Sequence, residues 1–82
     1  PRIELLEPRG TNSPIGRFIK QRGEGIQQLA VEVDDIDSMI SLLKQMGCRM
    51  INEEAVSGAS GSRIAFVHPS STGGVLVELV QH

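Results

Sequence analysis

The first candidate functional residue is a glutamate whose neighbours in the sequence are apolar. Glu78 lies in the segment "VLVELV" (75–80), between Leu76 and Val80. Side chains of a strand alternate between its two faces, so this carboxylate would share a face with those two apolar residues. A lone glutamate in a strand is most often solvated, but a carboxylate shielded from water generally requires a partner or an ion. Glu78 is therefore a candidate for acid-base or metal chemistry.

Two adjacent glutamines, Gln27 and Gln28, begin a second strand-like segment, "IQQLAVEV" (26–33). Alternation predicts Gln28 on one face with Ala30 and Glu32, and the apolar Leu29, Val31 and Val33 on the other. Amide side chains at such positions can simply hydrogen bond within a sheet.

Other polar side chains have plainer explanations. His68, in "FVHPSS", is expected to bond nearby backbone at a strand end rather than act as a base. The segment "SSTGG" (70–74) could offer N–H groups to an anion, although such clusters are mostly plain turns. Cys48 has no second cysteine to pair with, so it is expected to fill space as a small apolar residue.

The elements that position these groups follow from periodicity and from capping residues. Ser13, Pro14 and Gly23 predict a helix between them, and Asp34 or Asp35 begins a second helix that ends at Gly47. One face of that second helix is apolar and must cover a sheet; its residues are Ile36, Met39, Ile40, Leu43 and Met46. Strands are predicted at 2–8, 26–33, 48–52, 63–69 and 75–80, with a glycine and serine loop at 56–62.

Composition limits the classes of function. The chain has 82 residues, a net charge of −2, two phenylalanines and no other aromatic residue, which argues against nucleic acid as a partner. We find no apolar run of the roughly 20 residues that span a bilayer, and no signal peptide, so no membrane partner is expected. Together with the single cysteine, this predicts a cytoplasmic protein.

The same order of elements carries a family resemblance. The chain resembles the C-terminal half of methylmalonyl-CoA epimerases, members of the vicinal oxygen chelate (glyoxalase, bleomycin-resistance, extradiol dioxygenase) superfamily. The resemblance implies an α+β fold: a single βαβββ module at 25–82, preceded at 1–24 by the last strand of a first module and a connecting helix. The segments that carry it are "IELLEP", "SPIGRFIKQRGEGI", "LAVEVDDID" and "GSRIAFVHPSSTGGVLVEL".

The resemblance also implies a metal site. In the epimerases each module supplies one ligand from its first strand, usually histidine, and one from its last, usually a glutamate or glutamine. Glu4 in "IELLEP" and Glu78 match the two last-strand ligands, and Gln28 falls where the second module has a histidine. The first module's histidine and acid-base glutamate have no counterpart here. Glu78 would then serve as both ligand and catalytic base.

Replacing an imidazole by Gln28 makes this implied site all oxygen, which suits soft metals poorly. The expected cofactor is a divalent metal of the Co, Mn, Mg or Ni class, or no metal at all. Epimerisation would remove the proton beside a thioester carbonyl and return it on the other face, which needs two acid-base groups. Arg17, Lys20 and Arg22 could meet the phosphates of coenzyme A, or form a solvated helix face.

A single module leaves a sheet face and sheet edges open, so we expect it to pair. The expected partners are a second copy of the chain, which would bring two Gln28 and two Glu78 side chains to one centre, or a separately encoded first module. A swap of the N-terminal strand and helix is a third route.

Two functions follow from these residues and this resemblance. The first is a methylmalonyl-CoA epimerase-like isomerase acting on an acyl-CoA, partial or inactive as an isolated chain. The alternative is a metal-free module of the same superfamily that binds a small ligand in the dimer cup. Gln28 in place of histidine favours the second, whereas the epimerase-like segments favour the first.

Overall fold

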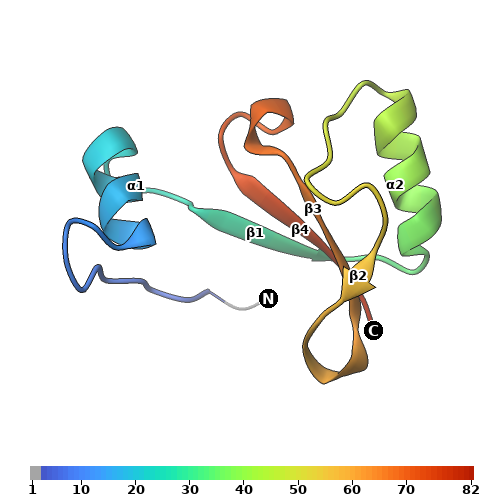
Figure 1. Ribbon diagram of the computed structural model, residues 1–82, viewed down its shortest axis with the longest axis horizontal. Coiled ribbons are helices and arrows are strands. Elements are labelled where there is room, and N and C mark those ends of the chain that lie inside the picture. The colour runs from blue at the N-terminus through green and yellow to red at the C-terminus, as the bar shows by residue number, and fades with distance from the viewer. Residues whose placement is uncertain (1–2) are drawn as a thin grey trace.

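The computed structural model describes residues 3–82, which form two α-helices and one four-stranded sheet (Figure 1). This mixed architecture confirms the α+β class. None of the helices in this part of the chain is long and apolar enough to cross a membrane. The elements are α1 (Pro14–Arg22), β1 (Gln28–Glu32), α2 (Ile36–Gln45), β2 (Val56–Ser57), β3 (Arg63–Val67) and β4 (Leu76–Gln81), with 3-10 turns at Ala59–Gly61 and Pro69–Ser71.

The strands lie in the order β1-β4-β3-β2. β1 and β4 are parallel, whereas β4 with β3 and β3 with β2 are antiparallel. A parallel pair requires a crossover connection, which α2 and the two strands after it provide. The predicted order of strand, helix and three strands from residue 26 onward is therefore confirmed.

The second strand of this order lies later than predicted. The segment 48–52 forms a single bridge, Met50 with Val67, and the two-residue strand β2 lies in the expected glycine and serine loop. Asn52 explains the interruption, because its side-chain Oδ1 accepts the backbone N–H of Phe66 at 2.8 Å. A side chain thus takes the place of the next ladder bond, and the predicted strand at 48–52 is wrong beyond its bridge.

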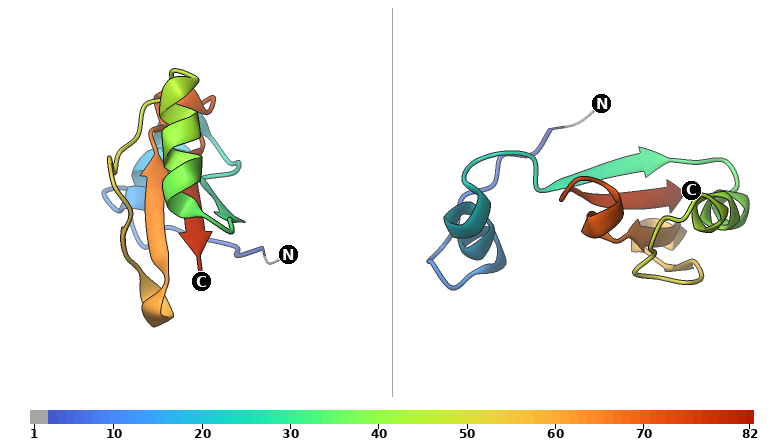
Figure 2. Two further views of the ribbon diagram at one scale, coloured as in Figure 1. Left: turned by 90° about the vertical axis from the view of Figure 1, so that its right-hand side faces the viewer. Right: turned by 90° about the horizontal axis from the view of Figure 1, so that it is seen from above.

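Helix α2 covers one face of the sheet. Asp35 caps it by accepting hydrogen bonds from the backbone N–H and the hydroxyl of Ser38, and these bonds lower the pKa of its carboxyl group. Seen from the side of α2, the helix lies in front of β3 and β4 (Figure 2). The residues of this packed core are Ile36, Ile40, Met50, Ala65, Val67 and Leu79.

The end of α2 departs from its predicted apolar stripe. The helix stops at Gln45, and Met46 is the C-cap with 69% of its surface exposed. Gly47 follows with φ of +87°, a left-handed conformation that favours glycine, and so reverses the chain after the helix. The prediction that Met46 belongs to the buried stripe is therefore wrong, whereas the predicted glycine stop is confirmed.

The other face of the sheet is open in residues 3–82. Strand register places Ala65 beside Leu79 on the face that α2 covers, and Phe66 beside Glu78 on the opposite face. Alternation adds Leu76, Val80 and Gln28 to this second face, which we call the open face. An uncovered sheet face that is rich in apolar side chains is the surface on which a further layer would pack.

Helix α1 stands at the opposite end of the molecule from α2 (Figure 1). Its predicted caps are confirmed, because the Ser13 hydroxyl accepts the N–H of Gly16 at 3.0 Å and the Gly23 N–H reaches Ile19 O at 2.8 Å. Residues 3–8 before it form no strand, although a strand was predicted there. A strand needs a neighbour for its backbone groups, and this segment lies apart from the sheet; Arg2 is outside the described residues.

Candidate functional site

Gln28 and Glu78 meet on the open face, although 50 positions separate them in the sequence. The parallel register of β1 and β4 places Gln28 beside Leu76 and Ala30 beside Glu78. Across this diagonal, Gln28 Nε2 donates a hydrogen bond to Glu78 Oε1 at 3.2 Å. The structure therefore brings together two of the three residues that the sequence predicted for a site.

Apolar residues share the sheet face of Glu78, as predicted. Leu76 and Val80 share its face, and the register adds Phe66 as its partner on β3. Glu78 is half-buried, while Gln28 at the sheet edge is exposed. Phe66 was not predicted to belong to the site, because its position depends on how β3 aligns with β4, which no pattern within either strand reveals.

The hydrogen bond fixes the orientation of the Gln28 amide. Its nitrogen points to Glu78, so its carbonyl oxygen is left to accept a donor or to ligate a cation. The second oxygen of Glu78 is available in the same way, since the described residues place no donor on it. The pair thus presents two oxygen donors from neighbouring strands.

Glu4 lies elsewhere. It belongs to the exposed N-terminal segment, which contributes no strand to the sheet that carries Gln28 and Glu78. Within residues 3–82 no group of three or more histidine, cysteine, aspartate or glutamate side chains could hold a metal ion.

His68 bonds to nearby backbone, as the sequence predicted. Its Nδ1 accepts the N–H of Ser70 at 3.0 Å, and its own backbone N–H reaches Arg49 O at 2.8 Å. The segment that follows consists of the 3-10 turn Pro69–Ser71 and a further turn at 72–74 that leads into β4. This histidine therefore stabilises a strand end.

A two-pronged ion pair connects α2 with β3. Arg63 donates from both of its terminal nitrogens to the two carboxylate oxygens of Asp37, each at 2.9 Å. This hydrogen-bonded pair lowers the pKa of Asp37 and raises that of Arg63. The pair therefore links α2 to β3 at the surface of the sheet.

Comparisons with known proteins agree with this geometry. The family model described as Glyoxalase/Bleomycin resistance protein/Dioxygenase superfamily matches residues 1–66. The mitochondrial methylmalonyl-CoA epimerase of Bos taurus is 44% identical over 81 residues, which are 98% of this chain and 46% of the bovine protein. The chain thus spans about half the length of the curated relatives it matches.

Solved structures give the same result. The methylmalonyl-CoA epimerase of Mycobacterium tuberculosis superimposes with a TM-score of 0.69 at 47% identity, covering 90% of this chain and 49% of that one. A methylmalonyl-CoA epimerase in complex with methylmalonyl-CoA and NH4+ has a TM-score of 0.69 at 37% identity, covering 93% of this chain and 53% of that one. The family model, the βαβββ order and these superpositions agree: the chain belongs to the glyoxalase, bleomycin resistance protein and dioxygenase superfamily.

Proposed function

We propose that this chain is part of an acyl-CoA epimerase of the methylmalonyl-CoA type. The observation that carries the proposal is the hydrogen-bonded pair of Gln28 and Glu78 on the open apolar face. Relatives named methylmalonyl-CoA epimerase support the substrate class, since they match nearly the whole chain. In this proposal residues 25–82 are one module, and residues 1–24 connect it to another.

The proposed chemistry is a proton transfer beside a thioester carbonyl. The carboxylate of Glu78 takes or returns the proton, and the Gln28 amide holds that carboxylate in one orientation through its N–H. Phe66, Leu76 and Val80 exclude water from the reacting carbon, which favours proton transfer between fixed partners. Inversion needs a second acid-base group on the opposite side of the substrate, which must come from the partner of this module.

The pair also fits a divalent metal in part. Gln28 Oε1 and one oxygen of Glu78 are hard ligands on adjacent strands, which suits Mg²⁺ or Mn²⁺ better than Co²⁺ or Ni²⁺. A bound metal would act as a Lewis acid toward the thioester oxygen. Further ligands would come from outside the pair, either from a partner module or from Glu4 once its segment joins a sheet.

The partner in this proposal covers the open face. A second copy of the chain would contribute the same pair by twofold symmetry, whereas a complementing first module would contribute different residues. Either arrangement also covers the exposed side chains of β1, whose five residues are all exposed in this chain. Cytoplasmic location stays a prediction, and the name of the bovine relative places that protein in mitochondria.

A metal-free binding module is the second candidate function. The Gln28 amide already satisfies one oxygen of Glu78, so the carboxylate does not require a cation to be stable on this face. The apolar neighbours of Glu78 would then hold a small ligand rather than exclude water from a reaction.

Deuterium exchange at the α-carbon of methylmalonyl-CoA tests the proposal, with native mass spectrometry in Mn²⁺ or Co²⁺ reporting assembly and metal content. We expect exchange by an assembled species, loss of exchange in Glu78→Gln, and tighter Co²⁺ binding in Gln28→His because imidazole is the stronger ligand. Glu32→Gln is the matched control for Glu78→Gln, because Glu32 is a carboxylate on the open face at the end of β1 opposite Gln28. An assembled species that binds methylmalonyl-CoA without any exchange would support the binding module instead.

A further inference from the structure

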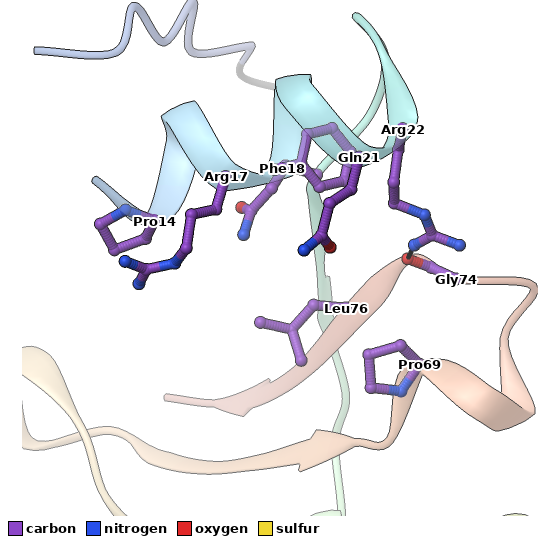
Figure 3. A pocket seen from close by; sticks show the side chains of 9 residues that line it. Pro14, Arg17, Phe18, Gln21, Arg22, Pro69, Gly74 and Leu76 are labelled. Carbon is purple, nitrogen blue, oxygen red and sulfur yellow. Dashed lines mark hydrogen bonds between the residues drawn. The ribbon is translucent and has the colours of Figure 1, made fainter. Parts of the chain in front are cut away.

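A pocket of about 340 Å³ lies between α1 and the beginning of β4. Figure 3 shows Arg17, Gln21 and Arg22 extending from α1 toward Leu76, Gly74 and Pro69 across it. Pro14, Phe18 and Gln27 complete the lining. The pocket therefore combines two cations and one amide from the helix, and the Gln27 amide from the segment before β1, with apolar residues of β4 and the turn before it.

Positive charge is concentrated at this pocket. The chain as a whole has a net charge of −2, yet α1 carries Arg17, Lys20 and Arg22 and no acidic residue. Two of these three cations, Arg17 and Arg22, line the pocket. An acidic protein with a locally cationic cavity attracts anions to that cavity.

The two arginines bind only neutral oxygens in the described chain. Arg17 donates to the carbonyl of Asn12, and Arg22 donates to the carbonyl of Gly74 at 2.5 Å. By contrast, Arg63 is paired with Asp37. A guanidinium has several N–H donors in a planar fork, so each of these arginines keeps donors and its full charge for an anion.

The turn before β4 has a glycine where the Arg22 side chain lies against it. Gly74 has φ of +95°, and a Cβ built on it would lie 2.0 Å from Arg22 Nη2. A side chain at this position would therefore displace the guanidinium. The absence of one leaves room for the Arg22 guanidinium beside the turn.

The pocket adjoins the Gln28 and Glu78 pair. Leu76 lines the pocket, is the register partner of Gln28, and lies two residues before Glu78 on the same face. Positions two apart on a strand are separated by about 6 to 7 Å. One molecule bound on this face could thus contact both the carboxylate and the pocket.

We propose that this pocket binds the phosphate-bearing nucleotide end of an acyl-coenzyme A. The guanidinium groups of Arg17 and Arg22 pair with phosphate oxygens, and Phe18 and Pro69 contact the organic part of the ligand. The assignment to acyl-coenzyme A rests on the proposed function, because it joins the nucleotide end to a thioester held near Glu78. The phosphate chemistry rests on the pocket alone.

Calorimetric titration of the full chain with four probes tests this assignment. Coenzyme A and ADP carry phosphate on an organic group, pantetheine lacks phosphate, and pyrophosphate lacks an organic group. We expect coenzyme A to bind at least as tightly as ADP, and both to bind more tightly than pantetheine or pyrophosphate. Tighter binding of ADP than of coenzyme A would overturn the acyl-coenzyme A assignment, and equal binding of pyrophosphate would reduce the pocket to a plain anion site.

Variants of α1 test the residues. Arg17→Gln and Arg22→Gln should each weaken coenzyme A binding about tenfold, because a charge-assisted pair to phosphate is lost. Lys20→Gln is the matched control, with the same charge change on the same helix but a side chain that lies outside this pocket. It should change affinity less than threefold or so at moderate salt. An equal loss of coenzyme A affinity in all three variants would overturn the proposed pocket, because it would mean that only the general positive field of α1 attracts the ligand.

Further measurements distinguish a loss of ligand binding from a loss of folded structure and from a loss of epimerase activity. Arg22 also donates a hydrogen bond to the turn before β4, so Arg17→Gln decides the result if Arg22→Gln changes the circular dichroism spectrum. Amide shifts on adding ADP should appear in α1 and around Gly74, and shifts confined to other regions would overturn the site. Glu78→Gln should abolish deuterium exchange while leaving ADP affinity unchanged, so failure of the epimerase proposal and failure of the pocket are distinguishable.

Discussion

The half of the sheet that α2 covers differs sharply from the edge formed by β1. In the covered half, Ile36 and Ala65 have no exposed surface and Leu79 has 4%. At the edge, Leu29 points to the same side of the sheet as Val77 yet is 52% exposed, because α2 lies over β3 and β4. The N-terminal segment resembles the edge, with Leu5 93% exposed.

This difference shows which part of the chain has a packed core of its own. The covered half forms a packed core from residues of this chain alone, whereas the β1 edge and the N-terminal segment expose apolar side chains that a soluble protein rarely leaves uncovered. The Gln28 and Glu78 pair lies on the border between the two regions. A partner that covers the edge would therefore also enclose the candidate site.

Ile36→Ala should break the covered half. The side chain is fully buried against β3 and β4, so its truncation removes apolar contact and leaves a cavity, at a cost of about 2 to 5 kcal/mol in the free energy of unfolding. Urea unfolding followed by circular dichroism measures the change. For a domain of this size such a loss is comparable with the whole stability.

Leu29→Ala provides the comparison for that variant. Its side chain is half-exposed, so the isolated chain should lose less than about 1 kcal/mol. When a partner covers β1, the same variant should weaken the assembly. Equal destabilisation of the isolated chain by both variants would mean that the edge is already packed and that the contrast between the regions is wrong.

Asn52→Ala should have the next largest effect. The Oδ1 atom of Asn52 accepts the N–H of Phe66, and removing it leaves a partly buried donor without its acceptor. We expect a loss of about 1 to 3 kcal/mol in the free energy of unfolding, with faster hydrogen exchange at Phe66. Asn12→Ala, in the exposed segment before α1, is the matched control and should leave both quantities unchanged.

Much of this fold is predictable from local patterns, because the periodicity of residues within a helix or strand indicates which side chains share a face. The caps Ser13 and Asp35 mark both helices, and alternation in 76–81 places Glu78 with Leu76 and Val80. The strand at 48–52 was misplaced because Asn52 bonds Phe66, a contact between segments that neither segment reveals. The strand at 2–8 was misplaced because a strand requires a neighbour, and composition does not say whether one is present.

The candidate site divides in the same way. Gln28 and Glu78 each lie on a predictable face, so the sequence could nominate both, and the register of β1 with β4 then brings them into contact. Phe66 and the Arg22 contact with Gly74 depend on register and on a turn conformation, so they became evident only in the assembled sheet. Glu4 shows the limit, because its proposed role depends on a sheet that this chain does not complete.

The smallest expected effect concerns pH and compares one ion pair from each region. Arg63 holds the pKa of Asp37 below its usual 3.8, so the pair stabilises the folded chain above that pH. This contribution disappears as the pH falls through the lowered pKa, because the folded state then gains the proton that the unfolded state already binds. Asp37→Asn should therefore be less stable than the wild-type chain at neutral pH, and the difference should shrink as the pH falls from 3.8 through the lowered pKa of Asp37.

Glu32→Gln is the matched variant at the β1 edge, where Glu32 lies 3.3 Å from His82. Both partners of that pair are mostly exposed, and it lacks the two-pronged geometry of Arg63 with Asp37, so urea midpoints at neutral pH should barely move. A larger shift for Glu32→Gln than for Asp37→Asn would contradict this ranking. It would mean that the β1 edge is held to the sheet by charge where apolar packing is missing, and that the edge is ordered before any partner covers it.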